Sequence, residues 1–282
     1  MCIRDRLYII ASMKIFSFNV NGIRARYHQL EKLISIHSPE VFCLQETKVH
    51  NDDFPHEEID KLGYHKIING QKGHYGVATF YKDNLISSSL GFETDTNEAQ
   101  CRLITSEHNF NKTKVHIING YFPQGDNRDH PTKFPYKEKF FKDLMKHLDK
   151  NFSKNDNIII LGDLNISPED IDIGIGEENR KRWLTSGKCS FLPEEREWLK
   201  KIKDWGFQDS YRKFYPETND KFSWFDYRSR GFDDSPKRGL RIDHLWVTKD
   251  LYDIAQSSGI DYEIRGMEKP SDHAPVWTEF NF

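Results

Sequence analysis

The sequence predicts an α/β protein whose buried strands end in polar side chains. Residues 158–161 are four apolar residues in a row, three of them β-branched, which is typical of a strand buried on both faces. The pattern of residues 14–45 predicts strand, helix and strand in succession, as in a βαβ-like unit. Asp163 and Asn165 follow the 158–161 strand two positions apart, so in extended geometry both side chains point the same way. A carboxylate and a carboxamide placed together there suit a metal, a water nucleophile and a phosphate.

Length and charge limit what this chain can be. With 282 residues it can bury a sizeable core, and strand-helix alternation continues through the middle without a linker, repeat or low-complexity run, which favours one domain. The net charge of −3 favours neither nucleic acid nor membrane, so a DNA-binding face would have to be a local patch. The four cysteines are scattered, which favours reduced thiols in a cytoplasmic protein over disulfides or a zinc site.

The N-terminus is predicted to be an extension outside the domain. The apolar run within residues 1–12 is too short for a signal-peptide core and far too short to span a bilayer. Met13 directly precedes a clean strand pattern, so the domain is predicted to span residues 13–282, with 1–12 either disordered or not native. No other segment approaches transmembrane length, and we expect a monomer with no membrane partner.

Hydrophobic periodicity predicts the other elements in chain order. Leu30, Leu33 and Ile34 recur at helical spacing, and Pro39 ends that helix. Helices are predicted at residues 27–37, 54–62, 133–151, 177–184 and 193–205. Strands are predicted at residues 14–21, 41–45, 77–81, 102–107, 114–122, 158–161, 242–248 and 274–280. The glycine-rich loop at 70–76 lacks the spacing of a nucleotide cradle, and residues 206–243 carry many aromatics but few regular patterns.

Polar side chains recur just past the ends of five predicted strands, where ligands bind in α/β proteins. They are Asn19 and Asn21, Gln45 and Glu46, Tyr121, Asp163 and Asn165, and Asp243 with Asp272 and His273. Each alone has an ordinary structural reading as surface decoration, an Asx-turn or a cap. Their joint recurrence predicts one functional site.

The residue types in these clusters suit metal-assisted phosphoester hydrolysis. Mg²⁺ takes oxygen ligands and commonly uses one or two carboxylates, and Glu46 is the best first candidate. His273 could pair with Asp243, which would fix the imidazole tautomer and allow proton transfer from water. The Gly-x-Ser-x-Gly nucleophile motif is absent from the sequence, so direct attack by water is favoured over a covalent intermediate.

Six motifs in order give the chain a family resemblance. They are 18–24 (FNVNGIR), 44–48 (LQETK), 119–121 (NGY), 162–165 (GDLN), 241–243 (RID) and 271–273 (SDH). Together they resemble the exonuclease III family of apurinic/apyrimidinic (AP) endonucleases, within the endonuclease/exonuclease/phosphatase superfamily. Residues 174–184 and 189–198 resemble its bacterial exonuclease III branch. The segment 230–239 is slightly longer than that pattern, and His244 follows Asp243 where the pattern does not place a histidine.

The resemblance implies a four-layer α/β sandwich of the DNase I-like type, with two packed mixed sheets flanked by helices. It implies a DNA repair nuclease that depends on Mg²⁺ or Mn²⁺ and acts on double-stranded DNA with abasic sites or 3′ ends. The implied activities are incision 5′ to abasic sites, 3′→5′ exonuclease activity and removal of 3′ blocking groups as a 3′-phosphatase and 3′-phosphodiesterase.

The resemblance also implies roles for individual residues. Glu46 would be the principal metal ligand, and the same metal site would be lined by Asn19, Asp163, Asn165, Asp272 and His273. Tyr121 would hydrogen-bond the scissile phosphate, and Asp243 would orient His273. Asp163 would activate water or protonate the leaving 3′-oxygen, and Asn165 would position the nucleophile or stabilise the transition state. Whether Asp163 or His273 is the general base, and whether one metal or two act, stays open.

DNA contacts are expected from a polar set and an apolar set. The polar candidates are Asn21, Gln124, Arg128, Lys133, Lys181, Arg182 and Lys188. The apolar candidates, which would wall a pocket for a flipped-out abasic sugar, are Phe222, Trp224, Leu240 and Ile242. The alternatives are solvated surface charges for the first set and core packing for the second.

Two other functions fit parts of the sequence. A phosphoinositide phosphatase or sphingomyelinase of the same superfamily would share the metal centre, since fold does not fix substrate. The basic segment 177–190 and the aromatic segment 222–225 favour DNA. A non-catalytic DNA-binding module would be expected to lack one of the four key side chains, yet Glu46, Asp163, Asp243 and His273 are all present.

Overall fold

The computed structural model describes residues 12–282. Residues 1–11 of the predicted extension lie outside the described residues. Ser12, the last residue of that predicted extension, is the first residue of strand β1 (Ser12–Asn19) and pairs with Asn281 near the C-terminus. The first strand therefore begins earlier than the sequence pattern predicts.

The strands form two mixed six-stranded sheets. The first has the order β11-β12-β1-β2-β4-β3 and adds β2 (Val41–Gln45), β3 (His65–Asn69), β4 (Val77–Tyr81), β11 (Ala255–Ile260) and β12 (Val276–Asn281) to β1. The second has the order β5-β6-β7-β8-β10-β9 and contains β5 (Leu85–Leu90), β6 (Leu103–Phe110), β7 (Thr113–Tyr121), β8 (Ile158–Asp163), β9 (Gln208–Asp209) and β10 (Asp243–Val247). Each sheet has one parallel pair, β1 with β2 and β7 with β8.

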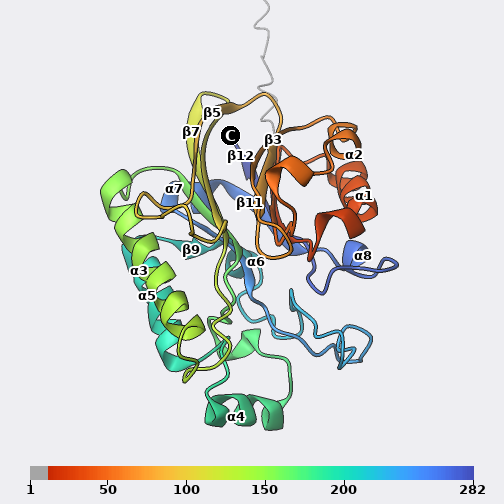
Figure 1. Ribbon diagram of the computed structural model, residues 1–282, viewed down its shortest axis with the longest axis vertical. Coiled ribbons are helices and arrows are strands. Elements are labelled where there is room, and N and C mark those ends of the chain that lie inside the picture. Colours follow the sequence, from red (N-terminus) through yellow and green to blue (C-terminus); the bar gives the residue numbers. More distant parts are fainter. Residues whose placement is uncertain (1–11) are drawn as a thin grey trace, which may run out of the picture.

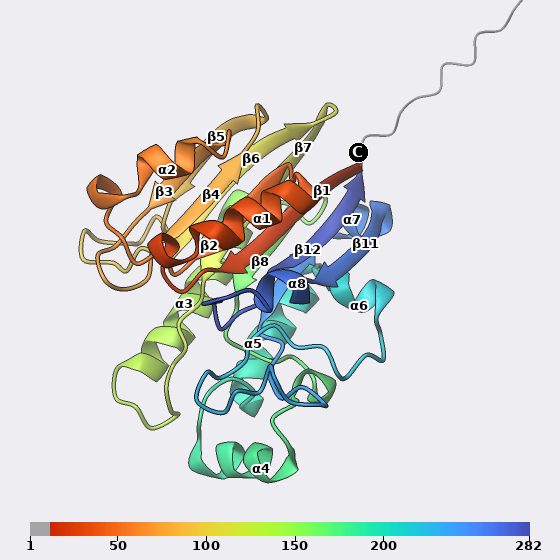
Figure 2. The ribbon, with the colours of Figure 1, turned by 90° about the vertical axis from the view of Figure 1, so that its right-hand side faces the viewer.

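Helices cover the outer faces of both sheets, as Figures 1 and 2 show. The helices are α1 (Tyr27–His37), α2 (His56–Asp60), α3 (Lys133–Asn151), α4 (Glu177–Ser186), α5 (Pro193–Trp205), α6 (Ser210–Phe214), α7 (Lys249–Ile254) and α8 (Tyr262–Arg265). Single 3₁₀ turns occur at Ile23–Ala25, Asn51–Asp53 and Asp170–Asp172. Helix α1 packs on the first sheet, and α3 and α5 pack on the second. The result is the predicted four-layer α/β sandwich.

Strand β8 shows why the layers hold together. Ile158 and Ile160 point into the apolar core shared with α3 and α5, whereas Ile159 and Leu161 point into the core between the two sheets. All four side chains have no exposed surface. Burying a side chain of this size stabilises the fold by about 1.5–3 kcal/mol. The alternation confirms the prediction that this strand is buried on both faces.

The strands that the sequence pattern does not predict share one position in the fold. The predicted limits of α1, α3, α5, β2 and β4 agree with the structure, and the other predicted elements are present with shifted ends. The strands that were not predicted are β3, β5, β9 and β11, which are the edge strands of the two sheets. An edge strand is half exposed and needs no continuous apolar pattern, as in the Ser87–Ser89 stretch of β5. The missed helices α6, α7 and α8 are short.

Two further expectations concern thiols and membranes. Within residues 12–282 no helix is both long and apolar enough to cross a membrane. Cys43, Cys101 and Cys189 are free thiols, and Cys43 and Cys189 are buried. Cys43 and Cys189 are thus packing residues, and the reduced state of the thiols stays a prediction.

Candidate active site

The candidate site lies where the strand ends of the two sheets meet. The register aligns Asn19 with Gln45 in the first sheet and Asp163 with both Tyr121 and Asp243 in the second. Because parallel strands end at the same edge, each parallel pair delivers two polar termini together. The five predicted strand-end clusters therefore converge on one place.

Asn19 joins the two sheets at this place. Its Nδ2 donates to Glu46 Oε1 at 2.9 Å and to Asp163 Oδ2 at 2.9 Å. Its Oδ1 accepts from the backbone N–H of Asn21 at 3.0 Å. The carboxamide thus faces both carboxylates with its nitrogen, and holds a carboxylate of each sheet in a fixed relation to the other.

Three side chains form a group that could hold a metal ion. Ligand atoms of Glu46, Asp163 and His273 all lie within 4.8 Å of one another. Asp272, which was predicted as a fourth ligand, does not belong to this group. Its Oδ1 instead accepts from Asn21 Nδ2 at 2.8 Å, and its Oδ2 accepts from Trp224 Nε1 at 3.1 Å.

Asp243 and His273 form the predicted pair. His273 Nδ1 lies 2.8 Å from Asp243 Oδ2, and His273 Nε2 lies 3.8 Å from Asp163 Oδ2. The position of Asp243 is set by Ser223, whose Oγ accepts from the backbone N–H groups of Ile242 and Asp243 at 3.0 Å each. A carboxylate on Nδ1 requires a proton there, which leaves Nε2 directed at Asp163.

Burial and crowding shift the pKa values of this pair. Burial raises the pKa of Asp163, and the neighbouring Asp243 and Glu46 raise it further against the opposing effect of His273. Burial would lower the pKa of His273, but Asp243 and Asp163 together raise it. The pKa of each group therefore depends on the charge of the other: His273 lowers the pKa of Asp163, and Asp163 raises the pKa of His273.

The pKa of Glu46 is shifted in the opposite direction to that of Asp163, whereas the pKa of Tyr121 is shifted in the same direction. Burial opposes ionisation of Glu46, but Lys48 at 2.8 Å and the hydrogen bond from Asn19 lower its pKa, so its carboxylate stays charged. Burial and the charges of Glu46 and Asp163 raise the pKa of Tyr121 well above 10. Its hydroxyl therefore keeps its proton and can donate a hydrogen bond to an anionic ligand.

Asn165 is held in a left-handed backbone conformation with φ of 53°. Its backbone N–H donates to Asp163 Oδ1 at 3.0 Å, and its Nδ2 donates to the carbonyl of Phe122 at 2.9 Å. Asparagine tolerates this region better than most residues, but the surroundings must still support it.

The sequence interpretation missed a buried pair beneath this loop. Lys137 of α3 and Glu195 of α5 have no exposed side-chain surface and form an ion pair at 2.5 Å. One signal was visible, because Lys137 lies on the apolar face of its helix with Phe140, Phe141 and Leu144. The partner on α5 could not be inferred from spacing.

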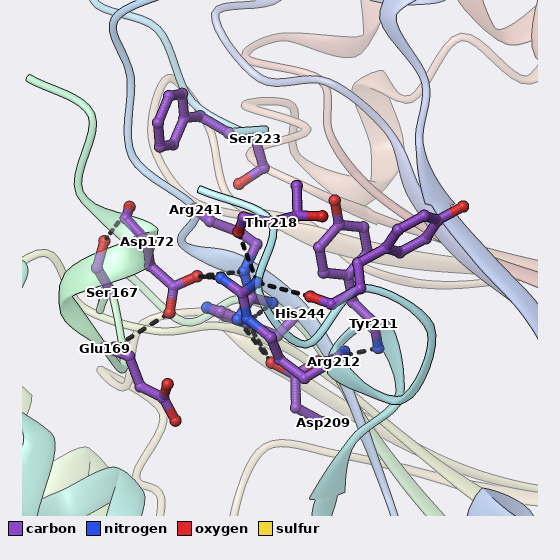
Figure 3. Close-up of polar contacts among 12 residues, drawn as sticks. Ser167, Glu169, Asp172, Asp209, Tyr211, Arg212, Thr218, Ser223, Arg241 and His244 are labelled. Carbon is purple, nitrogen blue, oxygen red and sulfur yellow. Dashed lines mark hydrogen bonds and ion pairs between the residues drawn. The ribbon is translucent and has the colours of Figure 1, made fainter. Parts of the chain in front are cut away.

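A second missed group lies behind Asp243, and Figure 3 shows its contacts. We call it the arginine cluster; its members are Asp172, Asp209, Arg212, Arg241 and His244. Arg241 donates to Asp172 at 2.6 Å and to Asp209 at 2.7 Å, and Arg212 also donates to Asp172. His244 Nδ1 lies 3.0 Å from an Arg241 nitrogen that can only donate, so Nδ1 accepts and Nε2 donates to the carbonyl of Ile166 at 3.1 Å. The unexpected histidine thus supports the loop that carries Asn165.

Comparison with known proteins identifies the family. The sequence profile of the Endonuclease/Exonuclease/phosphatase family matches residues 16–273. The chain belongs to this family. An exodeoxyribonuclease III of Haemophilus influenzae is 56% identical over 95% of this chain and all of its own length. An exodeoxyribonuclease of Bacillus subtilis is 28% identical over 94% of this chain and 98% of its own length. Within the family the chain is thus a member of the exodeoxyribonuclease III group, as the motifs predicted.

Solved structures agree in fold. The 3′ phosphatase NExo from Neisseria, bound to a product DNA hairpin, has a TM-score of 0.86 at 33% identity and matches 96% of this chain and all of its own. An AP endonuclease from Archaeoglobus fulgidus has a TM-score of 0.86 at 32% identity, with the same coverage of this chain and of its own. The DNase I-like architecture expected from the motifs is confirmed.

The polar candidates for DNA contact lie in two segments, of which the first follows β7. Lys133 pairs with Asp126 at 2.7 Å, and the backbone N–H of Asp126 donates to Gln124 Oε1 at 2.6 Å. Arg128 of the same loop forms an exposed ion pair with Glu194 of α5. Gln124 and Arg128 lie on the loop that follows β7, and Lys133 is the first residue of α3.

The remaining polar candidates lie on α4 and just after it. Lys181 is largely exposed and lies 3.5 Å from Glu177. Arg182 donates to Asn179 at 2.7 Å. Lys188 Nζ lies 3.7 Å from the centre of the Trp183 ring, a cation–π contact. Figure 2 shows α4 projecting from the end of the molecule opposite the chain's C-terminus.

The apolar candidates differ in exposure. Phe222, Leu240 and Ile242 are buried, with 1%, 1% and 3% exposed surface, and Leu240 and Ile242 pack with Phe191 in one apolar cluster. Trp224 is partly exposed and borders a cavity of about 110 Å³ that is also lined by Trp183 of α4. Of these four candidates, only Trp224 has exposed surface that a sugar or base could contact.

Proposed function

We propose that the protein is a DNA repair nuclease that hydrolyses phosphodiesters by direct attack of water. Its activities would be 3′→5′ exonuclease activity on double-stranded DNA, incision 5′ to abasic sites, and removal of 3′ phosphates and phosphodiesters. The names of its relatives support this range, since they include an exodeoxyribonuclease III, a 3′ phosphatase and AP endonucleases.

The observation that carries the proposal is the convergence of Glu46, Asp163 and His273 beside Asp243. The group combines a carboxylate with a lowered pKa, a carboxyl group with a raised pKa beside an imidazole, and a second carboxylate that orients this imidazole. General acid–base groups of this kind contribute about 10²–10⁴-fold to a rate.

A divalent cation, Mg²⁺ or Mn²⁺, would be held by Glu46 and Asp163, with Asn19, Asn165, Asp272 and His273 around it. The donor set fits, because carboxylate oxygens suit hard cations and the partly buried Glu46 and buried Asp163 lie with the His273 imidazole within 4.8 Å of one another. When bound, such a cation supplies Lewis-acid polarisation of the phosphate and lowers the pKa of water.

The residues of this chain would then handle the proton and the phosphate. One of Asp163 and His273, whose side chains lie 3.8 Å apart, would accept the proton of the attacking water, and the other would give a proton to the leaving 3′-oxygen. Asp243 holds the imidazole in the required tautomer. Tyr121 keeps its proton and would donate to the scissile phosphate, and Asn165 would orient the nucleophile.

An abasic site suits this surface as substrate. A nucleotide without a base costs little to extrude from the duplex, which is itself a source of selectivity. Trp224 donates a hydrogen bond to Asp272, which directly precedes His273 in the chain. Trp224 and the small cavity beside it therefore lie close to the proposed catalytic centre. The basic side chains proposed to bind DNA would contact its phosphates. We also propose that the enzyme is a monomer and that it acts in the cytoplasm. The free thiols support the cytoplasmic location.

A cleavage assay tests the proposal. Purified protein with Mg²⁺ should incise a duplex that contains one abasic site and should degrade a blunt duplex from its 3′ ends. Both activities should stop when EDTA is added. Inositol phosphates should be left intact. An intact abasic duplex under these conditions, or activity that EDTA does not change, would contradict the proposal; cleavage of inositol phosphates instead would favour the phosphatase alternative.

A further inference from the structure

Lys137 is a fully buried charge on a helix that otherwise packs an apolar face against the second sheet. Its side chain has no exposed surface, and it lies on α3 one turn before Phe140 and Phe141. Burying an ammonium group is costly unless every proton finds a partner. Its partners therefore indicate what the charge is for.

The three protons of the ammonium group have three acceptors. Lys137 Nζ lies 2.5 Å from Glu195 Oε1, 2.9 Å from the carbonyl oxygen of Asn165 and 3.2 Å from the carbonyl oxygen of Gln124. The second carboxylate oxygen of Glu195 accepts from the backbone N–H groups of Ser190 and Leu192 at 2.8 Å each. One ion pair thus joins three loops: the loop after Tyr121, the loop that carries Asn165, and the loop before α5.

Stability alone does not account for such a pair. Replacing a buried ion pair by apolar groups of similar volume is often neutral or stabilising, because the desolvation of two charges offsets their attraction. The contacts made here go to main-chain atoms of loops that border the catalytic centre. Asn165 needs such support, since its φ of 53° lies in the left-handed region.

We propose that Lys137 is a positioning residue that acts through Asn165. The carbonyl oxygen of Asn165 is held by Lys137, its N–H by Asp163, and its Nδ2 by Phe122. Within residues 12–282 no group donates a hydrogen bond to Asn165 Oδ1. The contacts of the other polar atoms therefore fix the direction of this oxygen and leave it available to accept from the nucleophile. Glu195 keeps the Lys137 ammonium group in place. The inference rests on the proposed nuclease function, in which Asn165 orients the nucleophile.

A set of variants separates positioning from stability. Lys137→Met removes the charge and keeps the length of the side chain, but it leaves Glu195 buried without a cation. The double variant Lys137→Met/Glu195→Gln removes both charges and keeps an oxygen for the N–H groups of Ser190 and Leu192. We expect the melting temperature to fall in the single variant and to recover in the double variant. We expect kcat on an abasic duplex to be about 10- to 100-fold lower in both, with KM little changed, as for outer partners of active-site ligands.

A double-mutant cycle with Asn165→Ala tests the route of the effect. If Lys137 acts through Asn165, adding Lys137→Met to Asn165→Ala should change kcat by less than about twofold, because interacting sites are not additive. Lys142→Met is the matched control, since Lys142 is an exposed lysine of the same helix that pairs with the surface residue Glu138 at 2.9 Å.

Two results would overturn the inference. One is recovery of kcat together with melting temperature in the double variant, which would make the pair purely structural. The other is a full multiplicative loss when Lys137→Met is added to Asn165→Ala. Both results can be obtained only if the wild-type enzyme cleaves the duplex. An inactive wild type would instead mean that the proposed function is wrong, so the two kinds of failure can be told apart.

Discussion

Two buried polar groups meet at strand β10 and differ in one respect. The catalytic group contains Glu46, Asp163 and His273 with Asp243, and the arginine cluster contains aspartates and a histidine of its own. Asp243 and His244 are neighbours on β10, so their side chains point to opposite faces. One side chain enters each group. The arginine cluster also has two guanidinium groups, and the catalytic group has none.

The counter-charges give the two groups opposite electrostatics. Burial would raise the pKa of Asp172 and of Asp209, but the charge of Arg241 and its hydrogen bonds lower both. In the catalytic group burial raises the pKa of Asp163, and neighbouring carboxylates add to the shift. Similar side chains are therefore fixed and charged on one face of β10, and poised for proton transfer on the other.

The largest expected effect comes from removing the carboxylate of Asp163. Asp163→Asn should lower the single-turnover rate of abasic-duplex incision by about 10²–10⁴-fold, the usual contribution of an acid–base group. Its melting temperature in metal-free buffer should not fall, because the change removes a charge that is crowded by Asp243 and Glu46. Asp253→Asn, at an exposed ion pair, is the control. An unchanged rate would remove Asp163 from catalysis.

The reverse pattern is expected for the arginine cluster. Arg241→Met leaves Asp172 and Asp209 without their shared cation, and breaking a buried pair in this way lowers the free energy of unfolding by about 3–5 kcal/mol. Urea unfolding of the purified variant measures the loss. Lys249→Met, at an exposed pair, should change stability by less than about 0.5 kcal/mol. A stable Arg241→Met protein would show that the cluster does not hold the fold.

The pH dependence of stability should also separate the two groups. The pKa values of Asp172 and Asp209 are lower in the folded protein than in the unfolded chain, where aspartate titrates near 3.9. Their contribution is therefore complete above the unfolded value and is lost as pH falls through it toward the folded values. In metal-free buffer, wild type should exceed Asp209→Asn in unfolding free energy at pH 6, and this gap should narrow between about pH 5 and pH 3. A constant gap over that range would contradict the expected ion pairing.

The catalytic group could be predicted from sequence and the arginine cluster could not. Glu46 follows a recognisable strand and Asp163 ends one, so local patterns and the rule that ligands bind at strand ends in α/β proteins were sufficient to group them. Asp243 instead begins β10, which runs antiparallel to β8, and the 241–243 motif marked it. Arg241 was visible in the 241–243 motif, but nothing local indicated that it would meet Asp172 and Asp209. Those contacts depend on how irregular segments pack, and the same limit hid the partner of Lys137. The four edge strands were missed for a related reason, since half-exposed strands carry weak apolar patterns.

The smallest effect is expected for a charge that belongs to neither buried group. Lys181 on α4 is exposed, and its nearest acidic partner is Glu177 at 3.5 Å. Lys181→Ala should leave the free energy of unfolding within about 0.5 kcal/mol of wild type. If Lys181 contacts a phosphate, the variant should bind duplex DNA more weakly, and the slope of log affinity against log salt should fall by about 0.9.

Fluorescence anisotropy in the Asp163→Asn background measures this slope without cleavage, with Lys142→Ala on α3 as the control. An unchanged slope would remove Lys181 from the DNA-binding surface. A loss of stability in Lys181→Ala would be the more informative failure. It would mean that an exposed charge can contribute as much to the free energy of unfolding as the arginine cluster. Burial would then no longer explain why charges in the buried groups on β10 affect stability more than surface charges do.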